Sequence, residues 1–229
     1  MKTNGNTILI TGGSAGIGFE LAKQFSQLGN KVLITGRNAE NLKQAADQLE
    51  NVIPSSGDVT NSESTDQLVA QIKQEHPELN MVINNAGYAD VYQLDSNANA
   101  FSKASREMET NYLSIVGLTE KLLPTLLGNE NSAVVNVTSI VAYYPQKMLP
   151  TYTASKAALK AYTDVLRETF EEQLNVFELI PPLVNTDFSK EIGGENGIPP
   201  KEVADELILA LEKNQWLVPV GMSKEFVTV

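Results

Sequence analysis

The chain has 229 residues, an ordinary globular composition and a formal charge of 17 − 28 = −11. A surface this acidic repels phosphate backbones, which argues against a nucleic-acid partner. The sequence has no cysteine and a single histidine, His76, so it excludes thiol catalysis and leaves too little for a histidine metal site or a Ser-His-Asp triad. We expect His76 to be exposed at a helix end. We predict neither a signal peptide nor an apolar stretch of the roughly 20 residues that span a bilayer, so we expect a cytoplasmic protein with no membrane or metal partner.

Short apolar runs rich in β-branched residues recur along the chain. Most are continuously apolar rather than alternating, which is typical of strands buried on both faces of a parallel sheet. Five runs show this pattern clearly: 7–12, 31–36, 81–87, 133–139 and 175–182. Two weaker candidates are 50–59 and 215–221.

Segments with helical spacing separate these runs. In the first of them Ile17, Leu21, Phe25 and Leu28 recur at steps of three or four residues, and Gly29 is placed to end the helix. Further helices are predicted over 39–49, 62–76, 101–127, 150–173 and 200–213.

Alternating strands and helices predict one α/β domain over residues 1–229, a doubly wound Rossmann-type fold. We expect a parallel sheet of about seven strands with helices on both faces. The longest segment without predicted structure is 183–199, and we interpret its part near 187–199 as a mobile flap over the substrate.

The first predicted strand leads directly into the glycine-rich segment TGGSAGIG, residues 11–18, which opens a helix. A helix N-terminus offers free N–H groups and a positive dipole end, which suit a phosphate. Gly12 would permit the tight turn, Gly16 would let the backbone approach a pyrophosphate, and Gly18 would let helix and strand pack closely. The spacing of the glycines matches the general dinucleotide-binding fingerprint only loosely, so a turn with a purely structural role is the alternative at this point.

Two tyrosine–lysine pairs have a spacing of four residues. That spacing brings side chains to one face only in a helix. Tyr143 and Lys147 flank Pro145, which breaks helical geometry, whereas Tyr152 and Lys156 lie in the Ala-rich segment TYTASKAALKAY. We therefore expect only the second pair to project together.

In this order the motifs resemble the short-chain dehydrogenase/reductase family, over about residues 5–220. The N-terminal segment NTILITGGSAGIG is similar to that of bacterial members of the family associated with D-alanylation of lipoteichoic acid. The matching positions are Thr11, Gly12, Gly16 and Gly18 for T-G-x-x-x-G-x-G, 84–87 for N-N-A-G, Asn111 in METNYLSIVG, Ser139 after the fifth strand, and Tyr152 and Lys156 for Y-x-x-x-K.

The resemblance implies a catalytic set of Asn111, Ser139, Tyr152 and Lys156. A free tyrosine has a pKa of about 10, and a nearby ammonium favours the phenolate. We expect Lys156 and an oxidised nicotinamide to bring this pKa near 7, which takes about 4 kcal/mol. Tyr152 would then act as acid in carbonyl reduction and as base in alcohol oxidation. Ser139 would bond the substrate oxygen. By resemblance, Lys156 also binds the nicotinamide ribose and Asn111 supports a water-linked proton relay.

The end of the second strand, LITGRN, bears on the cofactor. An acid at this place usually bonds the adenosine 2′-hydroxyl of NAD, but Gly36 stands there and Arg37 follows. Arginine suits the 2′-phosphate of NADP, so we predict NADP (NADPH), with NAD as the alternative. The alternative is that Arg37 merely points into solvent. The glycine loop weakens the case for NADP slightly, because Ser14 and Ala15 stand where some NADP-using relatives have a basic residue.

The resemblance places further residues around the nucleotide and the substrate. Those for the cofactor are Ser14, Ile17, Asn38, Asp58, Val59, Asn85, Ala86, Gly87, Pro181, Val184 and Thr186, with Tyr152 and Lys156 shared with catalysis. Pro182 replaces a common glycine and is expected to change the backbone approach to the nicotinamide. Four residues after Ser139 are expected either to form an apolar side of the substrate pocket or to pack in a loop or subunit contact. They are Tyr143, Tyr144, Met148 and Leu149.

We predict an oxidoreductase that transfers a hydride between NADP(H) and a small-molecule carbonyl or secondary alcohol. By resemblance we expect a homodimer or homotetramer built through 101–127 and 150–173. An NADP-binding redox sensor or regulator without turnover is the alternative. A sugar-nucleotide epimerase or dehydratase is disfavoured, because such relatives carry a substantial C-terminal substrate domain and this chain ends soon after its last predicted strand.

Overall fold

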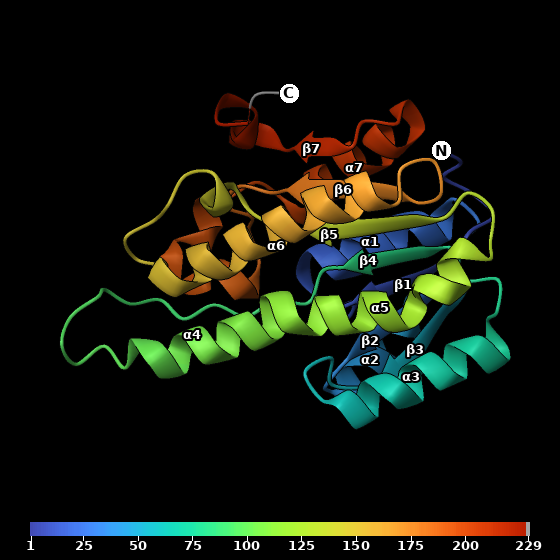
Figure 1. Ribbon diagram of the computed structural model, residues 1–229, viewed down its shortest axis with the longest axis horizontal. Helices are drawn as coiled ribbons and strands as arrows, with labels where there is room; N and C mark the ends of the chain where they lie inside the picture. Colours follow the sequence, from blue (N-terminus) through green and yellow to red (C-terminus); the bar gives the residue numbers. More distant parts are fainter. Residues whose placement is uncertain (228–229) are drawn as a thin grey trace.

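Seven parallel strands form one sheet in the computed structural model, which describes residues 1–227 (Figure 1). Their order across the sheet is β3-β2-β1-β4-β5-β6-β7. The strands are β1 (Thr7–Thr11), β2 (Lys31–Gly36), β3 (Val52–Ser56), β4 (Met81–Asn84), β5 (Ala133–Val137), β6 (Asn175–Ile180) and β7 (Leu217–Pro219). The α/β prediction is confirmed, and the two weak candidates form the two edge strands, where a continuous apolar pattern is not required.

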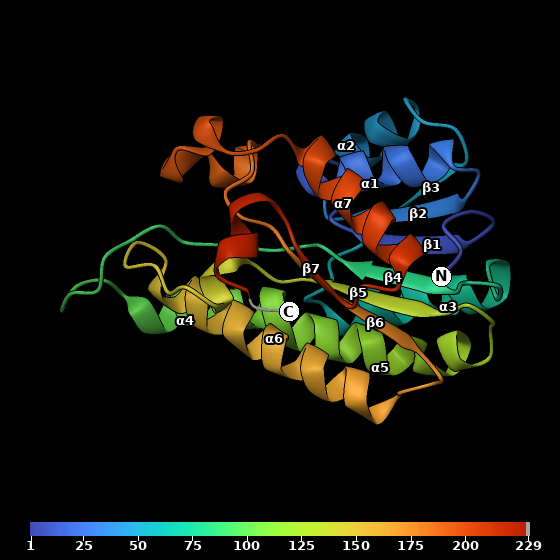
Figure 2. The ribbon, with the colours of Figure 1, turned by 90° about the horizontal axis from the view of Figure 1, so that it is seen from above.

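Helices cover both faces of the sheet. Figure 2 shows α1, α2 and α7 on one side and α5 and α6 on the other. The helices are α1 (Gly16–Gln27), α2 (Ala39–Ala46), α3 (Ser62–Glu75), α4 (Ala100–Met108), α5 (Ser114–Leu127), α6 (Pro150–Thr169) and α7 (Pro200–Lys213). In the described part of the chain, no helix is both long and apolar enough to cross a membrane.

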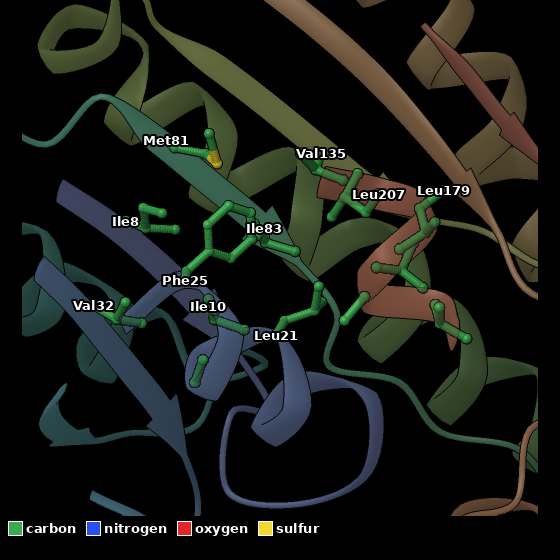
Figure 3. Packing of buried hydrophobic residues seen from close by; sticks show 14 of the residues in the cluster. Ile8, Ile10, Leu21, Phe25, Val32, Met81, Ile83, Val135, Leu179 and Leu207 are labelled. Atoms are coloured by element: carbon green, nitrogen blue, oxygen red, sulfur yellow. The ribbon is translucent and has the colours of Figure 1, made fainter. Parts of the chain in front are cut away.

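Successive strand residues pack into opposite layers. Ile8 and Ile10 of β1 lie in the core with α1, while Leu9 between them lies in the core with α3 and α5. Figure 3 shows Phe25 of α1 beside Ile8, Ile10 and Ile83. Both layers are buried and apolar, which is why the strands are apolar without alternation.

The sheet order reverses between β1 and β4, which are neighbours although two strands separate them in sequence. Connections run one way from β1 and the other way from β4, so a crevice opens at the carboxyl ends of these strands. Figure 2 shows the loop after β5 (yellow), the segment after β6 (orange) and the C-terminal turn (red), Gly221–Glu225 with its cap Phe226, gathered at this end.

Three sequence-based expectations differ from the structure. The helix expected over 101–127 contains a π-helical turn, Glu109–Leu113, between α4 and α5. The helix expected to reach 173 ends at Thr169, because the chain turns there to enter β6 and Glu172 has φ 70°. His76 is buried rather than exposed; it caps the C-terminal end of α3, and its carbonyl accepts the Leu79 N–H at 2.9 Å in the turn that leads to β4.

The segment 183–199 has short helical structure of its own. It contains 3-10 turns at Asp187–Ile192 and Gly194–Asn196. Its base is closed where Val184 bridges to Ile198 and the N–H of Asn185 donates to the Ile198 carbonyl at 2.8 Å. We call residues 187–198 the flap.

Candidate active site

One cavity of about 1550 Å³ lies at the carboxyl ends of the strands. The glycine loop, the loops after β2 to β6, the flap and the C-terminal turn all contribute to its wall. The parallel topology makes this possible, since strands that run one way bring their following loops to one edge of the sheet.

The glycine loop crosses the floor of the cavity in a conformation that needs glycine. Gly12 and Gly16 have φ of 66° and 54°. A Cβ on Gly18 would lie 2.3 Å from the Gly12 carbonyl oxygen, so only glycine allows α1 to pack this closely. Helix α1 begins at Gly16 with no side-chain cap and no acidic residue in its first turn. Its N–H groups are therefore left for an anionic ligand.

A hydrogen-bond lock joins this loop to the segment after β4. The Thr11 hydroxyl accepts the N–H groups of Asn85 and Ala86, each at 3.0 Å. In return, the Asn85 amide donates to the carbonyls of Thr11 at 2.9 Å and Gly12 at 3.2 Å. Thr11 and Asn85 thus set the spacing between two walls of the cavity.

The nucleotide residues expected after β2 and β3 line the same cavity. Two of them have side chains engaged by the protein: Asn38 caps α2 through the Asn41 N–H at 3.0 Å, and Asp58 accepts both the N–H and the hydroxyl of Thr60. Arg37 also lines the cavity and is exposed. None of the ion pairs within residues 1–227 involves its guanidinium.

The remaining predicted cofactor residues also border the cavity, with Gly18 just beneath its floor. Pro181, Val184 and Thr186 follow β6. A Cβ on Gly16 would lie 3.1 Å from the Thr186 methyl group, so the base of the flap rests against the glycine loop. Ser14, Ile17, Val59 and Gly87 complete the lining set.

Ser139, Tyr152 and Lys156 lie together on the opposite wall. Ser139 follows β5, and its hydroxyl accepts the N–H of Val141 at 3.3 Å. Tyr152 lies in the first turn of α6 and Lys156 one turn later. The Lys156 ammonium donates to the Val137 carbonyl at 2.8 Å and lies 5.7 Å from the centroid of the Tyr152 ring. The structure therefore gives the second tyrosine–lysine pair the shared face that the sequence predicted.

The electrostatics of this pair, considered for the protein alone, do not acidify Tyr152. Burial raises the pKa of Tyr152 above its ordinary value; the Ser139 hydroxyl opposes that shift and the charge of Glu107 adds to it. Burial also lowers the pKa of Lys156 to about 8. Both groups are deprived of water, so the protein's own groups favour the neutral phenol.

Asn111 sits in the π-helical turn and is fully buried. Its side-chain oxygen accepts the Tyr88 N–H at 2.8 Å, and its amide donates to the Tyr88 carbonyl at 2.8 Å and to the Ser155 hydroxyl at 2.9 Å. A Cβ on Gly87 would lie 3.4 Å from the Asn111 side-chain oxygen and 3.9 Å from the Lys156 ammonium. Asn111 is thus beside the pair, although its side chain bonds other groups.

Tyr143 is not part of the cavity wall and packs within the protein instead, which is the second of the two places expected for it. Its hydroxyl donates to the buried carboxylate of Glu178 at 2.8 Å, and the Thr138 hydroxyl donates to the other oxygen at 2.7 Å. These bonds tie the residues before and after Ser139 to β6. Tyr144, Met148 and Leu149 do line the cavity, as expected.

Sequence reasoning missed two buried carboxyl groups near the site. Glu178 interrupts the apolar strand VFELI, and that interruption is a signal that could have found it. Glu107 accepts the Asp90 N–H at 2.9 Å, and burial raises its pKa. Nothing in the local pattern around Glu107 marks it as buried, because it lies in a polar helix.

The arrangement fits a dinucleotide cofactor on the structure's own features. The glycine cradle has no room for a Cβ at Gly18, the start of α1 is uncapped, and an arginine lines the end of the cavity after β2. The glycine loop and Arg37 would hold the phosphates, and Lys156 would hold a ribose hydroxyl. Among the residues described, no three His, Cys, Asp or Glu side chains converge on a metal-sized site.

Known proteins match this chain over most of its length. The family described as short chain dehydrogenase matches residues 6–197. An uncharacterised oxidoreductase, DltE, of Bacillus subtilis is 35% identical over 90% of this chain and 82% of its own. An NADP-dependent 3-hydroxy acid dehydrogenase of Schizosaccharomyces pombe is 26% identical over 95% and 91%. A short chain dehydrogenase of Burkholderia cenocepacia, solved in complex with NADP, has a TM-score of 0.88 at 27% identity and covers 98% and 92%.

The buried Lys156 predicts a pH-dependent stability. Its pKa is lowered in the folded protein relative to the unfolded chain, so unfolding takes up a proton between about pH 8 and 10.5. Its burial cost is therefore fully present below pH 8 and is relieved as the pH rises. Relative to Lys156→Met, the wild-type free energy of unfolding should increase by about 1 kcal/mol from pH 7 to pH 9 in urea titrations. Lys147→Met, at an exposed lysine, controls for loss of a charge, and parallel curves for wild type and Lys156→Met would contradict the account.

Proposed function

The chain belongs to the short-chain dehydrogenase family, and we propose that it uses NADP(H) to interconvert a small-molecule carbonyl compound and its alcohol. It is an oxidoreductase of this family. The observation that carries the proposal is the placement of Tyr152 and Lys156, one helical turn apart, on the wall of the cavity that the glycine loop floors. When bound, the nicotinamide supplies or accepts the hydride at the substrate carbon.

The protein's own residues handle the proton and the oxygen. In reduction, Tyr152 donates its hydroxyl proton to the carbonyl oxygen while the new carbon–hydrogen bond forms, and in oxidation it takes the proton back. The Ser139 hydroxyl donates a hydrogen bond to the same oxygen and holds its developing negative charge. Lys156, next to the Tyr152 ring, stabilises the phenolate, and its pKa of about 8 keeps much of it charged at neutral pH.

Reprotonation of Tyr152 requires a path to water. Lys156 and Asn111 both lie beside Gly87, on the loop after β4. We propose that they begin this path, with a water molecule between them and Lys156 passing the proton to the phenolate. The hydrogen bonds of Asn111 to Tyr88 and Ser155 fix its position for that role.

The preference for NADP rests on the region after β2. Gly36 stands where an acid would repel a 2′-phosphate, and Arg37 lines the cavity without an ion-pair partner among the described residues. The named NADP dependence of the Schizosaccharomyces relative and the NADP in the Burkholderia structure support this preference. NAD is the alternative.

Removing the Tyr152 hydroxyl tests the catalytic assignment. Tyr152→Phe should lower kcat about 10²- to 10⁴-fold in a spectrophotometric screen of aldehydes and ketones, because the proton donor is lost. NADPH should still bind within a few-fold of wild type by calorimetry. Tyr162→Phe, on the same helix and away from the cavity, should retain activity. Unchanged turnover in Tyr152→Phe would favour a nucleotide-binding regulator or another chemistry.

Removing the Arg37 side chain tests the cofactor preference. Arg37→Ala should lower kcat/KM for NADPH about 10- to 100-fold and leave NADH nearly unchanged, because a charged hydrogen bond to phosphate is worth about 1.5–3 kcal/mol. Lys43→Ala is the matched control, since Lys43 is an exposed cation on α2 that pairs with Asp47 outside the cavity. A wild-type preference for NADH would reject the argument.

We also propose that the chain assembles as a homodimer or homotetramer through α4, α5 and α6. Phe101, Leu113 and Val165 are exposed on this side, and the Tyr112 and Tyr162 rings, 6.2 Å apart, join the π-helical turn to α6. Light scattering should give the mass of two or four chains, and Val165→Glu should reduce it because it buries a charge at the contact. A wild-type mass of one chain would contradict this proposal.

A further inference from the structure

Five large apolar side chains line the cavity although each is at least two-fifths exposed, and one of them, Phe188, lies next to Tyr152. They come from three separate segments of the chain: the loop after β5, the flap and the C-terminal turn. We call this set the apolar mouth; its members are Tyr144, Met148, Phe188, Met222 and Phe226. Scattered exposed apolar residues need no explanation, but a set gathered from distant segments around one opening marks a binding surface.

The apolar surface continues inward to the reacting groups. The Phe188 ring lies 6.0 Å from the Tyr152 ring, and the Tyr144 ring packs against Phe226 at 4.9 Å. Behind them, Val141 and Leu149 pack around Tyr152 together with apolar residues of the loop after β4 and of the flap. A chain attached to a carbonyl beside Tyr152 would therefore find apolar side chains both next to the reacting groups and on the exposed part of the cavity wall.

Charged groups at this end of the cavity do not favour an anionic substrate. The flap part of the lining has three carboxylates, Asp187, Glu191 and Glu195, and one ammonium, Lys190. The Lys156 ammonium also lies at this end, where it donates to the Val137 carbonyl. Arg37, the arginine of the lining, follows β2, whereas Ser139 follows β5. These two strands are three positions apart in the sheet, so their ends are about 14 Å apart at the usual strand spacing. A carboxylate or phosphate on the substrate would thus face net negative charge without a guanidinium partner.

We propose that the substrate is an uncharged aldehyde or ketone, or its alcohol, with an extended alkyl or aryl substituent that fills the apolar mouth. This inference rests on the proposed carbonyl reductase activity and adds the substrate class. Each methylene moved from water into the mouth should raise kcat/KM about fourfold, until the mouth is filled.

Two substrate series test the class with saturating NADPH. Unbranched alkanals from propanal to decanal test the alkyl chain, and 4-methylbenzaldehyde against 4-carboxybenzaldehyde tests the aryl group and charge at nearly constant size. We expect kcat/KM to rise along the alkanals, and the methyl compound to exceed the carboxylate about tenfold or more. Tyr144→Ser and Met222→Ser should flatten the dependence on chain length. Leu209→Ala, a similar truncation on α7 outside the cavity, should leave it unchanged.

A flat series, or faster reduction of the carboxylate, would overturn the substrate class while the carbonyl reductase function stands. If no carbonyl compound is reduced with either cofactor, the proposed function fails and the class is tested by binding. Calorimetry of the NADPH complex would then compare decanamide with decanoate. Tighter binding of the amide, lost in Tyr144→Ser, would support the apolar mouth, and equal or absent binding would overturn it.

Discussion

The site depends on one buried ammonium. Lys156 is held by the Val137 carbonyl at the end of β5, one helical turn after Tyr152 on α6. This contact joins α6 to the end of β5, and the same strand leads through Thr138 into Ser139. The cation thereby links the helix that carries the phenol to the strand that leads to the hydroxyl, at the carboxyl edge of the sheet.

Burying this group lowers the stability of the fold at neutral pH. Its pKa falls to about 8 because water is removed from it, while burial raises the pKa of Tyr152. Glu178 and Glu107 are buried as well. The Glu178 carboxylate accepts the Thr138 hydroxyl and the Glu107 carboxylate accepts the Asp90 N–H. Functional sites commonly hold such costly groups, and the two apolar layers of the sheet supply the stability that tolerates them.

Much of the fold could be predicted from the sequence, because it depends on local patterns. Continuous apolar runs identified the strands, and the helical spacing of Tyr152 and Lys156 separated this pair from Tyr143 and Lys147. The features that the sequence did not predict depend on tertiary contacts. The π-helical turn at Asn111 and the burial of His76 have no local signature. The pKa of Tyr152 could not be inferred either, since desolvation depends on what packs around the ring.

We infer that the Lys156 cation and the charge of oxidised nicotinamide together acidify a phenol that the protein alone keeps neutral. Ultraviolet difference titration of Tyr152 in the NADP⁺ complex tests it directly, with Tyr152→Phe subtracted to isolate the signal. We predict an apparent pKa near neutrality in the wild-type complex, and a value of 10 or above, as in an ordinary tyrosine, in Lys156→Met. The same high value in the wild-type complex would contradict the account.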